Sequence, residues 1–157
     1  MTTLLEAIQS SGARAVMVFS GGGSGALHAL LSHPGASRFF LAGRIPYAKE
    51  ALSTYLTEAP DSACSAETAQ KMAEQAFKEA ISWSDKEHAL GVSCTAALQT
   101  TRPRKGMDRA FICFCSLHAT SLHRLVLEEN SRQKQEEEVS RFLLEKLDLF
   151  LKTEAKK

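Results

Sequence analysis

A glycine-rich segment is the part of this sequence best suited to chemistry. Residues 18–31 read VFSGGGSGALHALL, in which a short apolar run precedes three glycines and an Ala- and Leu-rich run follows them. A strand, a sharp turn and a helix are expected in that order, and glycines let the backbone of such a turn approach a ligand closely. N–H groups at the start of a helix, together with the helix dipole, bind anions. The candidate ligand-binding residues here are Gly21, Gly22, Gly23 and Ser24.

This turn either carries chemistry, through one of its two serines, or serves only packing. Ser20 ends the expected strand and Ser24 lies within the turn, so either hydroxyl could contact a phosphate or act as a nucleophile. The segment is not a Walker motif, because no lysine follows the last glycine, and it is not a dinucleotide fingerprint. Many glycine-rich turns between a strand and a helix bind nothing, so packing is the alternative.

A second candidate lies in a basic segment, residues 101–109, which reads TRPRKGMDR. Proline and glycine keep this segment out of regular structure, and arginine pairs well with phosphate through two parallel hydrogen bonds. If the loop meets the glycine-rich turn at one end of a sheet, the two form a phosphate pocket at the carboxyl ends of the strands. A solvated basic loop is the alternative. The basic residues are Arg102, Arg104, Lys105 and Arg109.

The hydrophobic pattern predicts the elements that position these residues. The order of the elements favours a single α/β domain, residues 1–157, with a mixed central sheet and helices on both faces. The last two strands should pair antiparallel because their connection is too short for a crossover. The charged tail, residues 152–157, is expected to be disordered. Strands are expected at 14–20, 38–46, 89–95, 110–118 and 122–127, and helices at 2–11, 26–32, 48–56, 66–81 and 131–152.

Composition excludes several classes of protein. The chain of 157 residues is 44% hydrophobic and 24% charged, which are ordinary values for a globular domain. Its formal net charge of +1 is far from that of a protein that coats nucleic acid. No apolar run approaches the ~20 residues of a membrane helix, and the first 13 residues do not resemble a secretory signal. A cytoplasmic location without nucleic-acid or membrane partners is expected.

Other chemistry-bearing residues are expected to be structural. Cys94, Cys113 and Cys115 lie in apolar, strand-like runs, where a free cysteine behaves as a small hydrophobe. No cysteine, histidine or carboxylate cluster has the spacing of a metal site, so neither a metal nor a cofactor is expected. The run Glu136–Glu138 is expected to be a solvated face of the last helix.

Five segments along the chain carry a resemblance to a known family. They are SGGGSG at 20–25, PGAS at 34–37, IPY at 45–47, SAETAQKMAE at 65–74 and GVSCTA at 91–96. Together they resemble the CinA C-terminal domain, and most of all a eukaryotic branch of that family. The resemblance implies a three-layer α/β/α sandwich with a mixed sheet. It also implies a relation to bacterial nicotinamide-nucleotide amidases, which hydrolyse nicotinamide mononucleotide to nicotinic acid mononucleotide and ammonia.

The resemblance implies catalytic roles for single residues. Ser20 falls on the serine that begins the bacterial glycine turn and becomes the candidate nucleophile. The bacterial lysine that could deprotonate this serine falls on Leu52. Lys49, about one helical turn earlier, is the only nearby lysine and the candidate base. Thr95 survives from a second bacterial turn whose glycines and proline are absent here, and it becomes a candidate oxyanion donor.

The resemblance adds two further ligand-binding candidates. Tyr47 matches a family tyrosine, and Arg132 lies near the position of a bacterial arginine. The alternatives are a half-buried core tyrosine and an ordinary surface charge. Both candidates precede or begin expected helices, so they would lie at helix ends.

The sequence and the resemblance support two alternative functions. The first is an amide hydrolase acting on a nicotinamide nucleotide, but a serine without an adjacent base is a weak nucleophile. Whether the chain is an enzyme therefore stays open. The second is a non-catalytic module that binds a small phosphorylated, nucleotide-like ligand or that serves an oligomer. A homo-oligomer is expected, with the last helix or the strand at Phe39–Phe40 in its interface.

Overall fold

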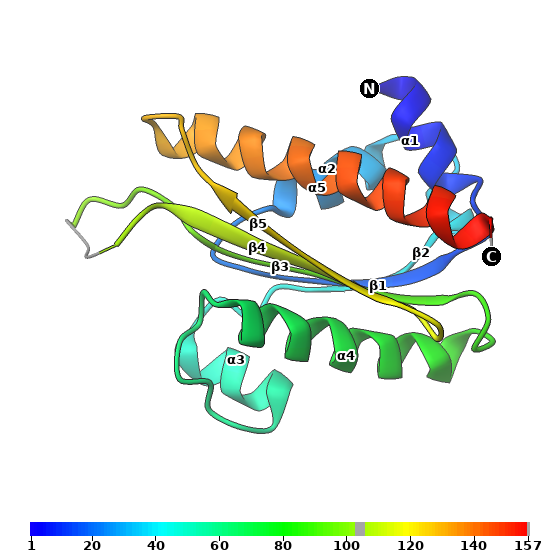
Figure 1. Cartoon of the computed structure of the whole chain (residues 1–157), viewed down its shortest axis with the longest axis horizontal. Coiled ribbons are helices and arrows are strands. Elements are labelled where there is room, and N and C mark those ends of the chain that lie inside the picture. Colours follow the sequence, from blue (N-terminus) through cyan, green and yellow to red (C-terminus); the bar gives the residue numbers. More distant parts are fainter. Residues whose placement is uncertain (103–105, 157) are drawn as a thin grey trace.

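A mixed five-stranded sheet forms the middle layer of the computed structural model, which describes residues 1–102 and 106–156 (Figure 1). The order across the sheet is β2-β1-β3-β4-β5. The strand β1 runs parallel to β2 and β3, whereas β3, β4 and β5 pair antiparallel in turn. The expected mixed sheet and its antiparallel pair are thereby confirmed. The strands are β1 (Arg14–Ser20), β2 (Phe40–Arg44), β3 (Ala89–Ala97), β4 (Arg109–Cys115) and β5 (Thr120–Val126).

Helices cover both faces of this sheet (Figure 1). One face carries α1 (Thr2–Gln9), α2 (Ser24–Ser32) and α5 (Arg132–Ala155), and the other carries α3 (Lys49–Leu56) and α4 (Ala66–Trp83). A short 3-10 turn, Ala36–Arg38, leads into β2. The three layers are those of the α/β/α sandwich that the resemblance implies. The helix α5 continues to Ala155, so the expectation of disorder from residue 152 is wrong for residues 152–155.

Alternation along β1 supplies both hydrophobic cores. Met17 and Phe19 pack in the cluster under α2 and α5, whereas Val16 and Val18 pack in the cluster under α3 and α4. Successive side chains of a strand point to opposite faces, which explains the division. A strand covered on both faces must be largely apolar, and between Arg14 and Ser20 every residue of β1 is apolar.

Part of the surface expected to form an oligomer interface packs inside the chain. Phe39 is fully buried in the cluster under α2 and α5. The apolar stripe of α5, formed by Val139, Leu143 and Leu147, is buried in the same cluster. Phe40 is half-buried and Leu149 on α5 is exposed, and the homo-oligomer stays a prediction.

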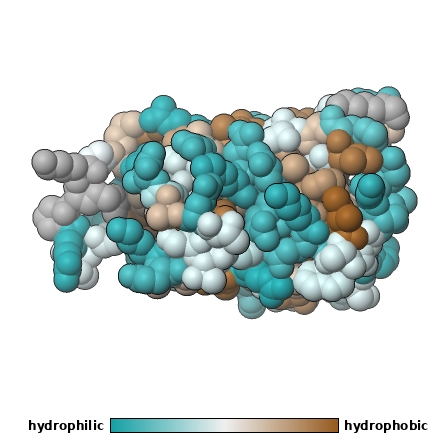
Figure 2. Space-filling model, turned by 90° about the horizontal axis from the view of Figure 1, so that it is seen from below, coloured by the Kyte–Doolittle hydropathy of each residue, from teal (hydrophilic) through white to brown (hydrophobic). Residues whose placement is uncertain are grey.

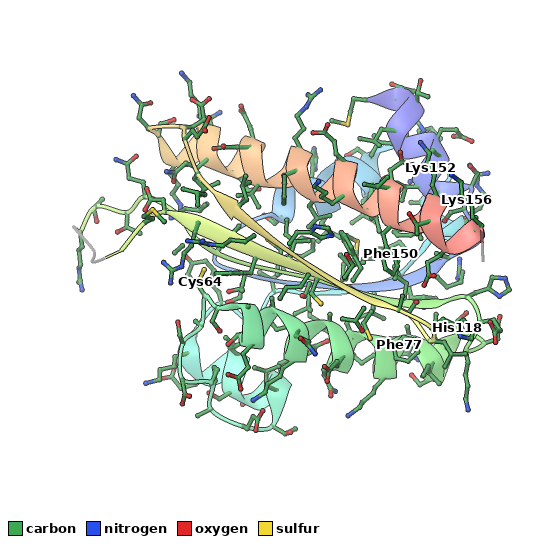
Figure 3. All side chains as sticks on the ribbon, viewed as in Figure 1. Cys64, Phe77, His118, Phe150, Lys152 and Lys156 are labelled. Carbon is green, nitrogen blue, oxygen red and sulfur yellow. The ribbon has the colours of Figure 1, made fainter. Side chains whose placement is uncertain are left out.

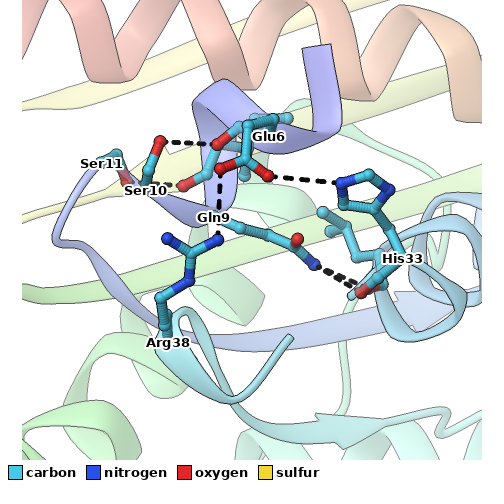
Figure 4. Close-up of polar contacts among 8 residues, drawn as sticks. Glu6, Gln9, Ser10, Ser11, His33 and Arg38 are labelled. Atoms are coloured by element: carbon cyan, nitrogen blue, oxygen red, sulfur yellow. Dashed lines mark hydrogen bonds and ion pairs between the residues drawn. The ribbon is translucent and has the colours of Figure 1, made fainter. Parts of the chain in front are cut away.

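Polar contacts attach the first helix to the rest of its layer (Figure 4). The side-chain amide of Gln9 donates to the carbonyl of Leu30 at 2.8 Å, near the end of α2. A carboxylate oxygen of Glu6 lies 3.3 Å from an Arg38 nitrogen, and its other oxygen lies 3.5 Å from the His33 ring. The exposed ion pairs contribute little, whereas the buried amide fixes α1 beside α2.

The face formed by α3 and α4 is mainly hydrophilic (Figure 2). Lys71 on α4 illustrates this, because its amine lies 2.7 Å from Glu58 and 3.1 Å from Glu67. Hydrophobic side chains gather toward the end of the molecule where α4 terminates (Figure 2). In the described part of the chain, no helix is both long and apolar enough to cross a membrane.

A capping bond sets the start of α4 and gives a first prediction. The Ser65 hydroxyl accepts a hydrogen bond from the Thr68 N–H at 3.1 Å. Ser65→Ala should lower the free energy of unfolding by about 1 kcal/mol, because that N–H loses its partner. Urea denaturation followed by circular dichroism measures the change. Ser82→Ala, at an exposed position of the same helix, is the control, and equal losses in both variants would contradict the capping role.

Candidate functional site

The candidate residues gather at the carboxyl ends of β1, β2 and β3, which we call the carboxyl edge. The register pairs Ser20 with Thr95, and Val18 with Arg44, three residues before Tyr47. Because the three strands are parallel, the segments that follow them leave the same edge of the sheet. The glycine-rich turn and the start of the basic loop therefore meet, as a shared site requires. Cys64 lies at this end of the molecule in Figure 3.

Arg132 draws separate segments together at the carboxyl edge. Its guanidinium donates to the Tyr47 hydroxyl at 3.1 Å and to the Gln99 carbonyl at 3.1 Å. These bonds use two of the five N–H groups of the guanidinium. Arg132 is exposed and Tyr47 is 63% exposed, so Tyr47 is not the half-buried core residue of the alternative interpretation. An accessible aromatic ring and an accessible cation lie side by side here.

A buried glutamine that the sequence analysis did not single out fixes the basic loop to α5. The Gln135 Oε1 atom accepts from the Gln99 N–H at 2.7 Å. Its Nε2 atom donates to Asp108 at 2.8 Å and to the Glu129 carbonyl at 3.1 Å. The side chain is 1% exposed, and a buried amide with its groups paired holds its neighbours in one arrangement. Gln135 is therefore a positioning residue for this edge.

The arginines that frame the basic loop have different roles. Arg102 is exposed and follows β3 at the carboxyl edge. The guanidinium of Arg109 donates instead to two main-chain carbonyls, both at 3.0 Å, and so supports the backbone. Arg104 and Lys105 lie outside the described residues. Among the described residues of the basic loop, Arg102 is thus the exposed cation that a ligand can reach.

Packing against β3 explains the glycines of the turn. Along the run Gly21–Gly23, a Cβ on the first residue would lie 2.0 Å from the carbonyl oxygen of Ala96. A Cβ on the second would lie 2.9 Å from Leu98, and one on the third 2.7 Å from the sulfur of Cys94. The first and third residues also have φ of 83° and 93°, which favours glycine. The neighbouring strand, without any ligand, accounts for this run.

The N–H groups at the start of α2 already have an anionic partner. Glu136 of α5 accepts hydrogen bonds from the N–H groups of Gly23 at 2.7 Å and Gly25 at 3.1 Å. The expectation that Glu136–Glu138 is a solvated face is therefore wrong. Glu138 also accepts from backbone N–H groups, and Glu137 alone of the three is exposed. The chain itself supplies the anion at the glycine-rich turn.

The surroundings of Ser20 are not those of an activated nucleophile. Ser20 is 4% exposed, and no hydrogen bond joins its hydroxyl to any described residue. Leu52 is fully buried beside Val18, which precedes Ser20 by two positions on the same face. Lys49 is exposed at the first turn of α3, and Ser24 is exposed at the first residue of α2. An apolar side chain thus occupies the position where the resemblance implies a base.

The hydroxyl of Thr95 is engaged in holding the fold. It donates to the Ala63 carbonyl at 2.6 Å, and Thr95 is 1% exposed. The thiol of Cys64, the next residue, lies 3.7 Å from the Thr95 carbonyl. A hydroxyl has one proton to donate, so this bond leaves none for an oxyanion. The geometry gives Thr95 a structural role, in tying the segment before α4 to β3.

The four cysteines are buried and form no disulfide. Burial raises the pKa of the Cys113 thiol to about 12 and also raises the pKa of Cys94. Thiols with such pKa values stay protonated and unreactive at neutral pH, as expected of small hydrophobes. Among the residues that the structure describes, no group of histidine, cysteine and carboxylate side chains could hold a metal ion.

Two cavities lie away from Ser20 and Tyr47. One of about 560 Å³ is at the opposite end of the sheet, and His118 and Phe150, labelled in Figure 3, are among its lining residues. The other, of about 710 Å³, is a groove between α2 and α5, and Gly25 and Glu136 contribute to its lining. The internal anion of the glycine-rich turn is therefore reachable from a solvent-filled groove.

The fold and the carboxyl edge together define the class of protein to which this chain belongs. The structure is an α/β/α sandwich with a mixed sheet, which is the architecture that the resemblance implies, and its strand β1 ends in the glycine-rich turn. The family model of the CinA C-terminal domain matches residues 2–151. The chain belongs to this family.

Solved structures share the fold at low sequence identity. The competence/damage-inducible protein CihA of Agrobacterium tumefaciens gives a TM-score of 0.81 at 18% identity, over 96% of this chain and 94% of that chain. A CinA superfamily protein of Escherichia coli gives 0.77 at 16% identity, over 96% and 86%. One of Klebsiella pneumoniae gives 0.76 at 17% identity, over 97% and 96%. No curated protein matches the sequence.

The bond between Thr95 and Ala63 gives a second prediction. Thr95→Val should lower the free energy of unfolding by about 1–3 kcal/mol, because the Ala63 carbonyl loses its partner. Urea denaturation measures this, and Thr120→Val, at an exposed position of β5, is the control. If Thr95→Val is as stable as the wild type, the hydroxyl is not structural and its availability to a ligand must be reconsidered.

Proposed function

We propose that this CinA-family domain binds a nucleotide-like ligand at the carboxyl edge and does not hydrolyse it. The observation that carries the proposal is the contact between Arg132 and Tyr47. It holds an exposed aromatic ring beside an exposed guanidinium. A nucleotide offers a flat base and a phosphate, which suit these two groups through stacking and paired hydrogen bonds.

A second cation supports the phosphate end of this site. Arg102 follows β3 at the same edge. The carbonyl of Gln99, three residues before Arg102, accepts a hydrogen bond from Arg132. The buried amide of Gln135 fixes this part of the loop through the Gln99 N–H. Arg132 begins α5, and Arg102 follows the supported residue Gln99 by three positions, which lowers the entropy cost of ordering the two around a ligand.

The absence of hydrolysis rests on the surroundings of Ser20. Leu52 fills the position of a base with a buried apolar side chain, and Lys49 is exposed to solvent. The Thr95 proton is used by a main-chain carbonyl. Loss of one member of a nucleophile–base pair costs on the order of 10⁶-fold in kcat. Binding at this edge needs none of these groups.

Thermal unfolding with nicotinamide mononucleotide tests the proposal. At ~100 times its Kd the ligand should stabilise the protein by about 2.7 kcal/mol, which raises Tm measurably. Ammonia, measured in the same samples, should not exceed that from Ser20→Ala. The riboside without phosphate should give a smaller shift, because it cannot pair with arginine.

Two variants localise the site. Arg132→Ala should abolish the shift in Tm caused by the nucleotide, since it removes both the cation and the support of the tyrosine. Arg141→Ala, an exposed arginine of the same helix paired with Glu145 at 3.6 Å, should keep it. Ammonia release above the Ser20→Ala level would establish an amidase instead. No shift with the nucleotide, the riboside or NAD would refute binding.

A further inference from the structure

A carboxylate from the last helix sits in the anion position of the glycine-rich turn. One oxygen of Glu136 accepts from the Gly23 N–H at 2.7 Å, and the other accepts from the Gly25 N–H at 3.1 Å. The Ser140 hydroxyl donates to this second oxygen at 2.6 Å. The residues that bind the carboxylate lie 111 and 113 positions away along the chain, so the tertiary fold creates this contact.

The inner side of this carboxylate is closely packed. A Cβ at position 25 would lie 2.6 Å from the Ser140 hydroxyl and 3.2 Å from the Glu136 carboxylate. Glycine there lets α5 approach α2 closely. Ser140 is 8% exposed and Gly23 is buried, so the carboxylate is held on its inner side by groups that solvent does not reach.

A free phosphate cannot use these N–H groups while Glu136 holds them. The helix dipole and the N–H groups of the turn stabilise one negative charge there. A group positioned by the fold competes with any free ion at a high effective concentration. A second anion brought beside the carboxylate would also be repelled by it. The N–H groups of the turn are therefore occupied by an internal anion.

We infer that Glu136 is the specificity-determining residue of the carboxyl edge: it is a tethered anion that excludes phosphate from the glycine-rich turn. The inference rests on the proposed function, whose ligand must then place its phosphate on Arg102 and Arg132. Glu136 thereby selects ligands whose anionic group lies beside Arg102 and Arg132. A ligand that needs the N–H groups of the turn is rejected.

Anion rescue of a Glu136→Ala variant tests this. The variant should unfold at a Tm lower by roughly 2–4 °C or more, because two N–H groups and a hydroxyl lose their acceptor. Sodium phosphate or formate should restore part of that loss, whereas sodium chloride at equal ionic strength should not. Glu137→Ala, at the exposed neighbouring position, should show neither the loss nor the rescue.

The wild-type protein provides a second measurement that does not depend on how the variant folds. The amide NMR signals of Gly23 and Gly25 should not move when phosphate is added at neutral pH. Saturable movement of these signals, or a Glu136→Ala variant that folds but gains no more from phosphate than from chloride, would overturn the inference. Neither result involves a nucleotide, so failure of this inference and failure of nucleotide binding are told apart.

Discussion

The first two turns of α5 hold the carboxyl edge together. Arg132, Gln135 and Glu136 are spaced i, i+3 and i+4, which places them on one side of a helix. Each binds a different segment: Arg132 binds the loop after β2, Gln135 the loop after β3, and Glu136 the turn after β1. One short stretch of helix thus fixes the segments that follow all three parallel strands. The later turns of α5 bury its apolar stripe in the core. This burial fixes where Arg132, Gln135 and Glu136 lie along the carboxyl edge.

The parallel pairing of β1 with β2 and β3 decides which segments α5 can reach. Ser20 and Thr95 are register partners, so the segments that follow them begin at the same height. Partners in parallel strands point to the same face of the sheet, here the face covered by α3 and α4. The two candidate hydroxyl groups therefore lie toward that layer, whereas Glu136 approaches from the other. The edge has two separate sides, one with the candidate nucleophile and one with the internal anion.

Much of the fold was predictable because it depends on local patterns. The run at 15–19 is apolar throughout, and the structure has β1 over residues 14–20. The sequence left open whether the glycine-rich turn meets the loop after β3, and the parallel pairing of β1 with β3 brings the two to one edge. Gln135 and Glu136 were not predictable in this way, since a polar side chain near a helix start has the same pattern whether it faces water or a distant backbone. The core role of Phe39 was missed for a related reason, because an aromatic pair does not reveal which ring is buried.

Residues on both sides of the edge oppose hydrolysis there. On the α3 side, Leu52 stands where the resemblance implies a base, and it is buried in the same cluster as Val18. On the α5 side, Glu136 fills the anion position of the turn. Either feature alone would weaken a hydrolase that holds its substrate's phosphate at the turn and attacks with the serine. Arg132, the first residue of α5, and Tyr47, which precedes α3, are exposed and join the two sides at the rim through their hydrogen bond. A ligand that uses only the rim needs neither a base nor a vacant turn, so binding can persist where hydrolysis has no support.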